Sequence, residues 1–218
     1  MIDWSWFPTN AERLVPALGA HLLLALLPVV IGLIVAIPLG WVANRSRPAR
    51  AVLVPVAGLL YTIPSLVLFI LLPGILGTQI LDPVNVVVAL SVYTVALLVR
   101  SVADALAAVP GMVVAAATAM GYRPARRFAQ VELPLSLPVL IAGLRVATVT
   151  NISLVSVGAL IGIGGLGYFI TDGFGRGNTT SIFAGVILIV VLALVFDALL
   201  VLIGRLVTPW VGVGGKAR

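Results

Sequence analysis

Apolar residues run almost unbroken along most of the chain, and polar residues gather in a few short segments between the runs. A helix needs about 20 apolar residues to cross the hydrocarbon core of a bilayer. Runs of about this length, the third of them shorter, occupy residues 18–43, 51–72, 84–99, 137–163 and 182–203. They lack the strict alternation of apolar and polar positions that is typical of membrane-spanning strands. The pattern therefore predicts an all-α membrane protein with about five transmembrane helices.

The composition agrees with a membrane protein and excludes several other classes. Hydrophobic residues make up 61% of the 218 residues and charged residues only 9%, whereas soluble domains carry about 25% charged residues. There is no cysteine, so disulfides, thiol nucleophiles and cysteine-bound metals are excluded. The net charge of +6 would suggest nucleic acid in a soluble protein, but arginine and lysine also concentrate in the cytoplasmic loops of membrane proteins. We therefore expect no nucleic acid partner.

The basic residues are divided unevenly between the two sides of the predicted spans. Arg13 and Arg176 fall on one side. All the others fall on the other side or just inside it: Arg45, Arg47, Arg50, Arg100, Arg123, Arg126, Arg127, Arg145, Arg205, Lys216 and Arg218. By the positive-inside rule, the side rich in arginine is cytoplasmic. The sequence thus predicts an outside N-terminus and a cytoplasmic C-terminus, which agrees with an odd number of spans.

The longest segment between spans, residues 100–136, lies on the predicted cytoplasmic side. It is too long for a simple turn between neighbouring helices, and its alanine-rich parts favour helix. Pro110 and Gly111 should break the first helix of the segment. Gly121 is expected to end the next helix in a left-handed conformation, which costs glycine little. The segment is therefore predicted to contain short helices separated by turns.

A third short helix is predicted over residues 125–131. Pro124 suits its first turn, and Leu133 with Pro134 should end it before the fourth span begins. Three arginines lie in or beside this helix: Arg123, Arg126 and Arg127. Small residues next to a cluster of positive charge favour the docking of another protein. The alternative is an amphipathic loop whose arginines bind lipid headgroups on the inner leaflet.

The spacing within this segment resembles a cytoplasmic motif of the permease subunits of ABC importers. That motif reads Glu-Ala-Ala, three residues, Gly, nine residues, Ile, one residue, Leu-Pro. The present chain repeats these intervals with two substitutions, since Ala115 stands where the family often has Glu and Val131 where it has Ile. The resemblance implies a coupling helix that seats in a groove of a cytoplasmic ATPase. The residues that it assigns to this coupling segment are Ala115, Ala116, Ala117, Gly121, Arg123, Arg126, Arg127, Val131, Leu133 and Pro134.

Further stretches resemble the branch of this family that imports quaternary ammonium osmoprotectants such as glycine betaine, choline or carnitine. They read TIPS at 62–65, GALIGIGGLG at 158–167 and LVTPW at 206–210, and Asp197 fits the same branch. Methionine-importer permeases share the glycine-rich stretch, so import of methionine or another amino acid is the alternative. The resemblance covers most of the chain and implies a single transmembrane permease domain over residues 1–218.

The resemblance also implies the other parts of the transporter. Two permease subunits, identical or paralogous, would flank the path in the cell membrane of a bacterium or archaeon. Cytoplasmic ATPase subunits would hold ATP and Mg, and an extracytoplasmic solute-binding protein would deliver the solute. This chain itself would bind no cofactor and catalyse no reaction. Alternatives of other classes are an intramembrane enzyme, for which the sequence offers neither a Ser/His pair nor an HExxH motif, and a membrane scaffold that docks a partner without moving a solute.

A few polar residues within the predicted spans are candidates for the lining of the path. They are Thr62, Pro64, Ser65, Asn151, Ser153 and Asp197. A carboxylate at the bilayer centre costs about 2.5–3.5 kcal/mol on insertion scales, so Asp197 should face other helices, either to attract a cationic solute or to bond a threonine or asparagine of the fourth span. The other residues could equally form hydrogen bonds between helices, and Pro64 should kink its helix. No metal site is expected, since the single histidine, His21, cannot form one by itself.

Overall fold

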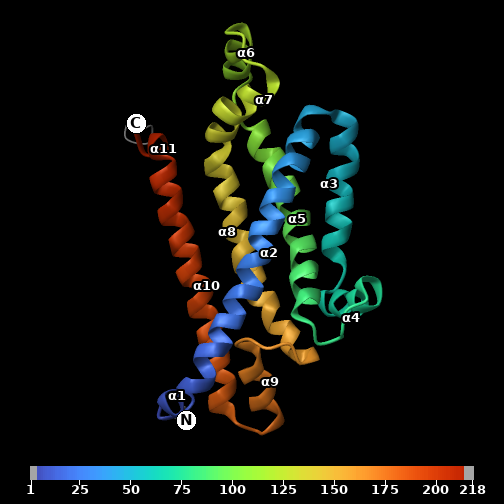
Figure 1. Cartoon of the computed structure of the whole chain (residues 1–218). Helices are drawn as coiled ribbons and strands as arrows, with labels where there is room; N and C mark the ends of the chain where they lie inside the picture. Colours follow the sequence, from blue (N-terminus) through green and yellow to red (C-terminus); the bar gives the residue numbers. More distant parts are fainter. Residues whose placement is uncertain (1–3, 214–218) are drawn as a thin grey trace.

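The computed structural model describes residues 4–213, and all regular structure in that range is helical. Four helical stretches are long and apolar enough to cross a membrane, and a sharply bent pair of helices would make a fifth crossing. The four are built on α2 (Ala11–Arg45), α5 (Pro83–Ala107), α8 (Leu133–Gly158) and α10 (Thr179–Val207). The bent pair consists of α3 (Arg47–Thr62) and α4 (Ser65–Leu76). The long helices run along the length of one bundle (Figure 1), which confirms the predicted fold class.

The second predicted span, residues 51–72, is divided into α3 and α4, which are bent by 101° at the break between them. The break lies beside Pro64, where the sequence predicts a kink. Pro64 lacks an N–H and disfavours helical backbone in the residue before it. Ile63 is accordingly extended, with φ −66° and ψ 128°. The hydroxyl of Tyr93 on α5 donates a hydrogen bond to the carbonyl of Ile63, so the freed backbone group at the break is bonded to the neighbouring helix.

The short apolar run 84–99 belongs to a longer helix, because polar residues at its start also suit a helix. The Asp82 side chain accepts a hydrogen bond from the N–H of Val84 at 2.9 Å, which caps the N-terminus of α5. Pro83 occupies the first position, where its missing N–H costs no hydrogen bond. The helix then continues to Ala107, inside the segment predicted as a loop. The third span therefore has ample length to cross a bilayer.

The central helix α5 packs against α2 along a stripe of small residues. Gly32, Ala36 and Gly40 lie about one helical turn apart on the buried face of α2. A Cβ atom on Gly32 would come within 2.4 Å of Thr94 Cγ2, and one on Gly40 within 2.5 Å of Val102 Cβ. In a membrane, close packing rather than hydrophobic burial holds helices together, so small residues at such a contact are stabilising.

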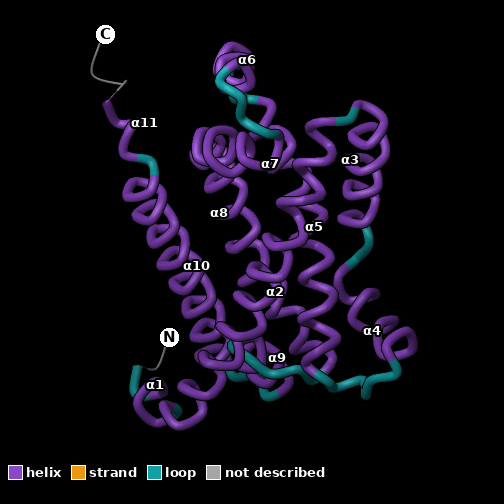
Figure 2. The backbone as a smooth tube through the Cα atoms, turned by 45° about the horizontal axis from the view of Figure 1, so that its top comes forward, coloured by secondary structure: helices purple, strands orange, loops and turns teal. Residues whose placement is uncertain are grey.

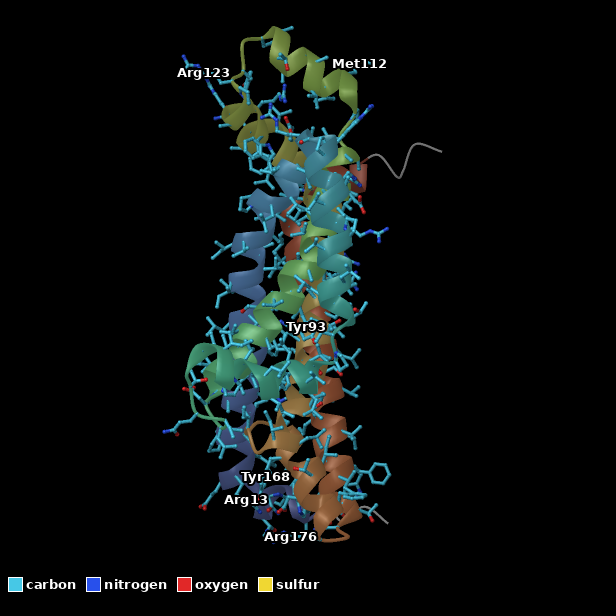
Figure 3. All side chains as sticks on the ribbon, turned by 90° about the vertical axis from the view of Figure 1, so that its right-hand side faces the viewer. Arg13, Tyr93, Met112, Arg123, Tyr168 and Arg176 are labelled. Carbon is cyan, nitrogen blue, oxygen red and sulfur yellow. The ribbon has the colours of Figure 1, made fainter. Side chains whose placement is uncertain are left out.

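The short elements gather at the two ends of the bundle (Figures 1 and 2). At one end lie α6 (Gly111–Ala119), α7 (Pro124–Arg127), α11 (Pro209–Val213) and the turn between α2 and α3. At the opposite end lie α1 (Trp6–Thr9), α4, the 3-10 turn η2 (Ala159–Ile161) and α9 (Gly167–Gly175). Figure 3 shows Arg13 and Arg176 at the α9 end and Arg123 at the α6 end. These three arginines thus lie at the two ends to which the predicted orientation assigns them.

Candidate functional site

The α6 end projects from the bundle as a bent knob, which we define as residues 110–132 (Figure 1). Within it Gly121 has φ +84°, a left-handed conformation that glycine adopts at little cost. The N–H of Gly121 donates to the carbonyl of Thr118 at 3.0 Å, and the N–H of Tyr122 donates to the carbonyl of Ala117 at 3.1 Å. These two bonds form a Schellman motif that closes α6. The predicted glycine end of this helix is therefore confirmed.

The predicted end of the next helix at Leu133 and Pro134 is wrong. α7 passes into a π-helical turn, η1 (Phe128–Glu132), and then directly into α8. In η1 the N–H of Leu133 bonds to the carbonyl of Phe128. A proline in an ordinary helix leaves one hydrogen bond unmade and crowds the carbonyl of the previous turn, and the wider π turn accommodates Pro134. The knob is therefore continuous with a membrane-spanning helix.

The residues that the motif assigns to coupling divide into an exposed and an enclosed group. The exposed ones are Ala115, Ala116, Gly121, Arg123 and Arg126. The buried or half-buried ones are Ala117, Arg127, Val131, Leu133 and Pro134. Met112 and Met120 join the exposed group, at 85% and 71% exposure, and Figure 3 shows Met112 and Arg123 at the same extremity of the molecule. The exposed group is the surface that a partner could reach.

Arg127 points into the knob and not toward a partner. Its side chain is 15% exposed, and its Nε donates to Oε1 of Glu132, whose side chain is 5% exposed, at 2.5 Å. Its Nη1 donates to Thr118 Oγ1 on α6 at 2.6 Å. Arg127 therefore ties α6 to the start of α8. We call Thr118, Arg127 and Glu132 the knob brace; two of its members, Thr118 and Glu132, lie outside the set assigned by the motif.

Asp197 is paired with an arginine and not with a threonine or asparagine of the fourth span. Nε and Nη2 of Arg145 donate to Oδ1 and Oδ2 of Asp197, both at 2.7 Å. Two parallel bonds of this kind are the strongest arrangement for a guanidinium and a carboxylate. The pair joins the middle of α8 to α10. Arg145 therefore belongs to the membrane-spanning part of the bundle, although its charge was counted with the cytoplasmic loops in predicting the orientation.

The remaining candidates for the path do not form one cluster. Asn151 is buried, and its Nδ2 donates to Thr94 Oγ1 at 2.9 Å and to the Ala25 carbonyl at 3.4 Å. It therefore joins α8 to α5 and α2. Three candidates lie at the break between α3 and α4: Thr62, Pro64 and Ser65. Only Ser153 lies near Asp197, and these two line the same hollow.

His21 is fully buried and connects three parts of the α9 end. Its Nε2 bonds to the carbonyl of Ile152 at 2.9 Å, and its Nδ1 accepts a hydrogen bond from the N–H of Leu166 at 3.2 Å. This arrangement places the ring proton on Nε2. Gly165, with φ +106°, passes so close that a Cβ there would lie 3.1 Å from His21 Nδ1. His21 is thus a packing residue, and residues 4–213 contain no group of three side chains that could hold a metal ion.

Comparison with known sequences identifies the class of protein. Residues 23–212 match the family described as "Binding-protein-dependent transport system inner membrane component". The choline transport system permease protein OpuBB of Bacillus subtilis is 30% identical over 201 residues, which cover 92% of this chain and 91% of OpuBB. The osmoprotectant import permease protein OsmW of Salmonella typhimurium is 33% identical over 203 residues, which cover 92% of this chain and 94% of OsmW.

Comparison with solved structures shows that ABC transporters share the fold of this chain. An inward-facing structure of the MetNI methionine ABC transporter matches with a TM-score of 0.79 and 26% identity, over 89% of this chain and 96% of the other. An amino acid ABC transporter solved with histidines has the same fold, with a TM-score of 0.78 at 19% identity, over 94% and 99% of the two chains. The chain belongs to the family of inner membrane components of binding-protein-dependent transport systems, which are transport subunits and not enzymes.

Proposed function

We propose that this chain is the permease subunit of an ATP-driven importer for a quaternary ammonium osmoprotectant such as glycine betaine, choline or carnitine. Its family supports the transport role. The solutes of OpuBB, a choline permease, and of OsmW, an osmoprotectant permease, support the solute class, since both match over at least 91% of either chain. The single observation that carries the coupling role is the exposed knob, whose residues repeat the motif of ABC-importer permeases and whose end runs without a break into α8.

The exposed group of knob residues is the surface that we expect to bind in a groove of the ATPase. The small side chains of Ala115 and Ala116 would let a groove of the partner approach closely, and Arg123 and Arg126 would offer it positive charge. ATP and Mg would be bound by that partner. The enclosed motif residues would act differently, by holding the knob in shape. Because the knob ends in η1, which runs directly into α8, a movement of the knob would be passed to the membrane-spanning helices.

In the proposed transporter, two permease subunits, identical or paralogous, stand side by side in the lipid bilayer of a bacterial or archaeal cell. The N-terminus lies outside and the knob lies in the cytoplasm. The concentration of arginines at the knob end supports this orientation. An extracytoplasmic binding protein would then deliver the solute to the α9 end.

Import of methionine or another amino acid is the second candidate, because the MetNI methionine transporter matches in fold at 26% identity. The two candidates share one machine and differ in the solute alone. The solute specificity of the cognate binding protein separates them.

The test is solute uptake into proteoliposomes that contain this chain with the ATPase and binding protein that copurify from its native membrane. We expect ATP-dependent uptake of at least one of glycine betaine, choline and carnitine, and tight binding of the same solute by the binding protein. Uptake of methionine alone would establish the second candidate. Absence of a copurifying ATPase, or ATP-independent activity on a membrane substrate, would contradict the proposed function.

A further inference from the structure

The ion pair between Arg145 and Asp197 plays no part in the coupling surface and needs an explanation of its own. Arg145 lies halfway along α8, and α10 diverges from α8 toward the α6 end (Figure 1). The side chains of Arg145 and Asp197 remain 39% and 32% exposed. Charged groups within a bilayer core face water or protein and not lipid, because exposure to lipid is costly. The seam between α8 and α10 is therefore expected to face a watery path or a second subunit.

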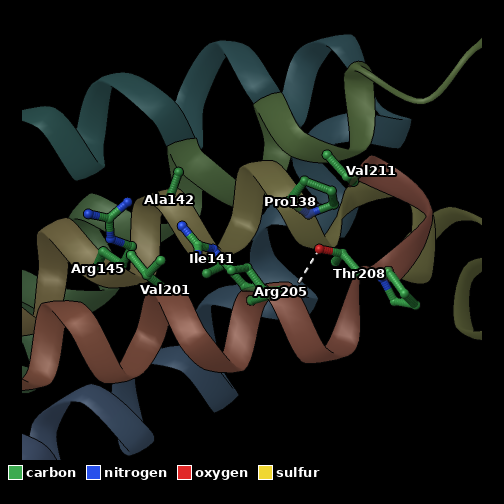
Figure 4. A pocket seen from close by; sticks show the side chains of 10 residues that line it. Pro138, Ile141, Ala142, Arg145, Val201, Arg205, Thr208 and Val211 are labelled. Carbon is green, nitrogen blue, oxygen red and sulfur yellow. Dashed lines mark hydrogen bonds between the residues drawn. The ribbon is translucent and has the colours of Figure 1, made fainter. Parts of the chain in front are cut away.

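The pair separates two hollows along this seam. The hollow on the α9 side has a volume of about 490 Å³, and Val149, Ile189 and Leu194 are among its apolar walls. Ser153 and Asp197 supply its polar groups. The hollow on the α6 side, about 380 Å³, has Arg145 and Arg205 among its walls (Figure 4). One hollow thus ends on a carboxylate and the other on a guanidinium.

These two ends match the two ends of a zwitterionic quaternary ammonium solute. A quaternary ammonium group has no N–H to donate and carries methyl groups around its positive charge. It therefore suits apolar walls with one carboxylate, which is the composition of the hollow on the α9 side. The carboxylate of such a solute suits a guanidinium, which binds carboxylates through two parallel hydrogen bonds. Arg145 already makes this pair of bonds with Asp197.

We propose that Arg145 and Asp197 form a solute subsite inside the membrane, where Asp197 binds the quaternary ammonium head and Arg145 binds the carboxylate of a zwitterionic solute. This inference rests on the proposed function and names a site within it. Without solute, the charges of Arg145 and Asp197 neutralise each other. When a zwitterion binds, its ammonium group pairs with Asp197 and its carboxylate pairs with Arg145, so that neither charge is left unpaired. A solute that is only a cation leaves Arg145 without a partner. The subsite therefore favours zwitterions.

The test compares glycine betaine, a zwitterion, with choline, a cation, in proteoliposomes that contain the complete transporter. Asp197→Asn is expected to lower the uptake of both solutes about tenfold or more, because one charge-assisted contact is lost for each of them. Arg145→Gln is expected to lower the ratio of glycine betaine uptake to choline uptake about tenfold, because only glycine betaine contacts Arg145. Asp104→Asn, which removes the charge from the pair between Asp104 on α5 and Arg50 on α3, is the matched control and should leave both rates unchanged.

The variant Arg145→Asp/Asp197→Arg, in which the two residues are exchanged, distinguishes a solute subsite from an ion pair that only holds α8 and α10 together. It keeps an ion pair between α8 and α10 but reverses the charge that each hollow presents, so uptake should stay at least about tenfold low in the assembled transporter. Uptake at the wild-type rate in this variant, or an unchanged solute ratio in Arg145→Gln, would overturn the proposal. The ratio does not depend on how much transporter assembles. If the wild type transports none of glycine betaine, choline and carnitine, the proposed function itself fails, which is a different result.

Discussion

Valine in place of Gly121 is expected to detach the permease from its ATPase, whereas asparagine at this position should leave most of the complex intact. Gly121 has φ +84°, and a Cβ added there meets nothing within 4 Å. The backbone and not the available space therefore decides the outcome. A left-handed conformation costs an ordinary residue about 1–2 kcal/mol; it is a genuine outlier for a β-branched residue, while asparagine tolerates it.

The measurement is the amount of ATPase that copurifies with each variant, followed by ATP-dependent uptake. Gly121→Val should lower both about tenfold or more, and Gly121→Asn less than about threefold. Gly74→Val in α4 is the control, because it adds the same side chain at the other end of the bundle in open space. Equal losses with valine and asparagine would show that any side chain blocks the contact. Full retention with valine would contradict a role for this turn in coupling.

Leucine in place of Glu132 is expected to lower the stability of the chain and the amount of bound ATPase. The substitution leaves the enclosed guanidinium of Arg127 without its carboxylate partner. Breaking a buried ion pair by removing one partner costs about 3–5 kcal/mol, whereas replacing both partners with apolar residues is often neutral. Arg127→Leu/Glu132→Leu should therefore be more stable than Glu132→Leu alone. The exposures of Arg127 and Glu132, 15% and 5%, place the pair in the range where this comparison applies.

Thermal unfolding of the purified chain in detergent measures the stability of these variants, and copurification of the ATPase measures the shape of the knob. Gln130→Leu is the matched control on the same turn, since its side chain is exposed and accepts a hydrogen bond from the exposed Arg126. We expect a large loss with Glu132→Leu, recovery of most of the stability in the double variant, and little change in the control. Equal losses in the single and double variants would show that the unpaired guanidinium of Arg127 is not the cause of the loss.

The coupling segment could be predicted from local rules, because each of its signals acts within a few residues. Gly121 ends α6 in the expected conformation, since a Schellman motif depends on the glycine and on bonds within one turn. The limit of the same rules appears at Pro134. There a π turn keeps the helix continuous, and local propensity does not foresee such a turn. The inward direction of Arg127 also escaped the motif, because it depends on Glu132 and Thr118 on two different helices.

The membrane-spanning helices were predicted in number and approximate place from apolar runs, but their contacts were not. Pro64 signalled a kink, and the angle of 101° depends on how α4 and Tyr93 meet in three dimensions. The small residues of α2, Gly32, Ala36 and Gly40, have a spacing that is readable in the sequence, yet only the structure shows that they face α5. The partner of Asp197 was wrong for the same reason, because nothing in the sequence aligns α8 with α10.

The most direct test of the coupling role is site-specific crosslinking from the knob in the native membrane. The chain has no cysteine, so a single introduced cysteine is the one position of this chain that can carry a thiol-linked photoreactive group. Met112→Cys and Met120→Cys place this group on the exposed knob, and Ile75→Cys, at 73% exposure, places it at the other end of the bundle. A coupling role for the knob predicts covalent adducts with an ABC ATPase from positions 112 and 120 and none from position 75. ATPase adducts from none of the three positions, in membranes where the ATPase is present, would contradict it.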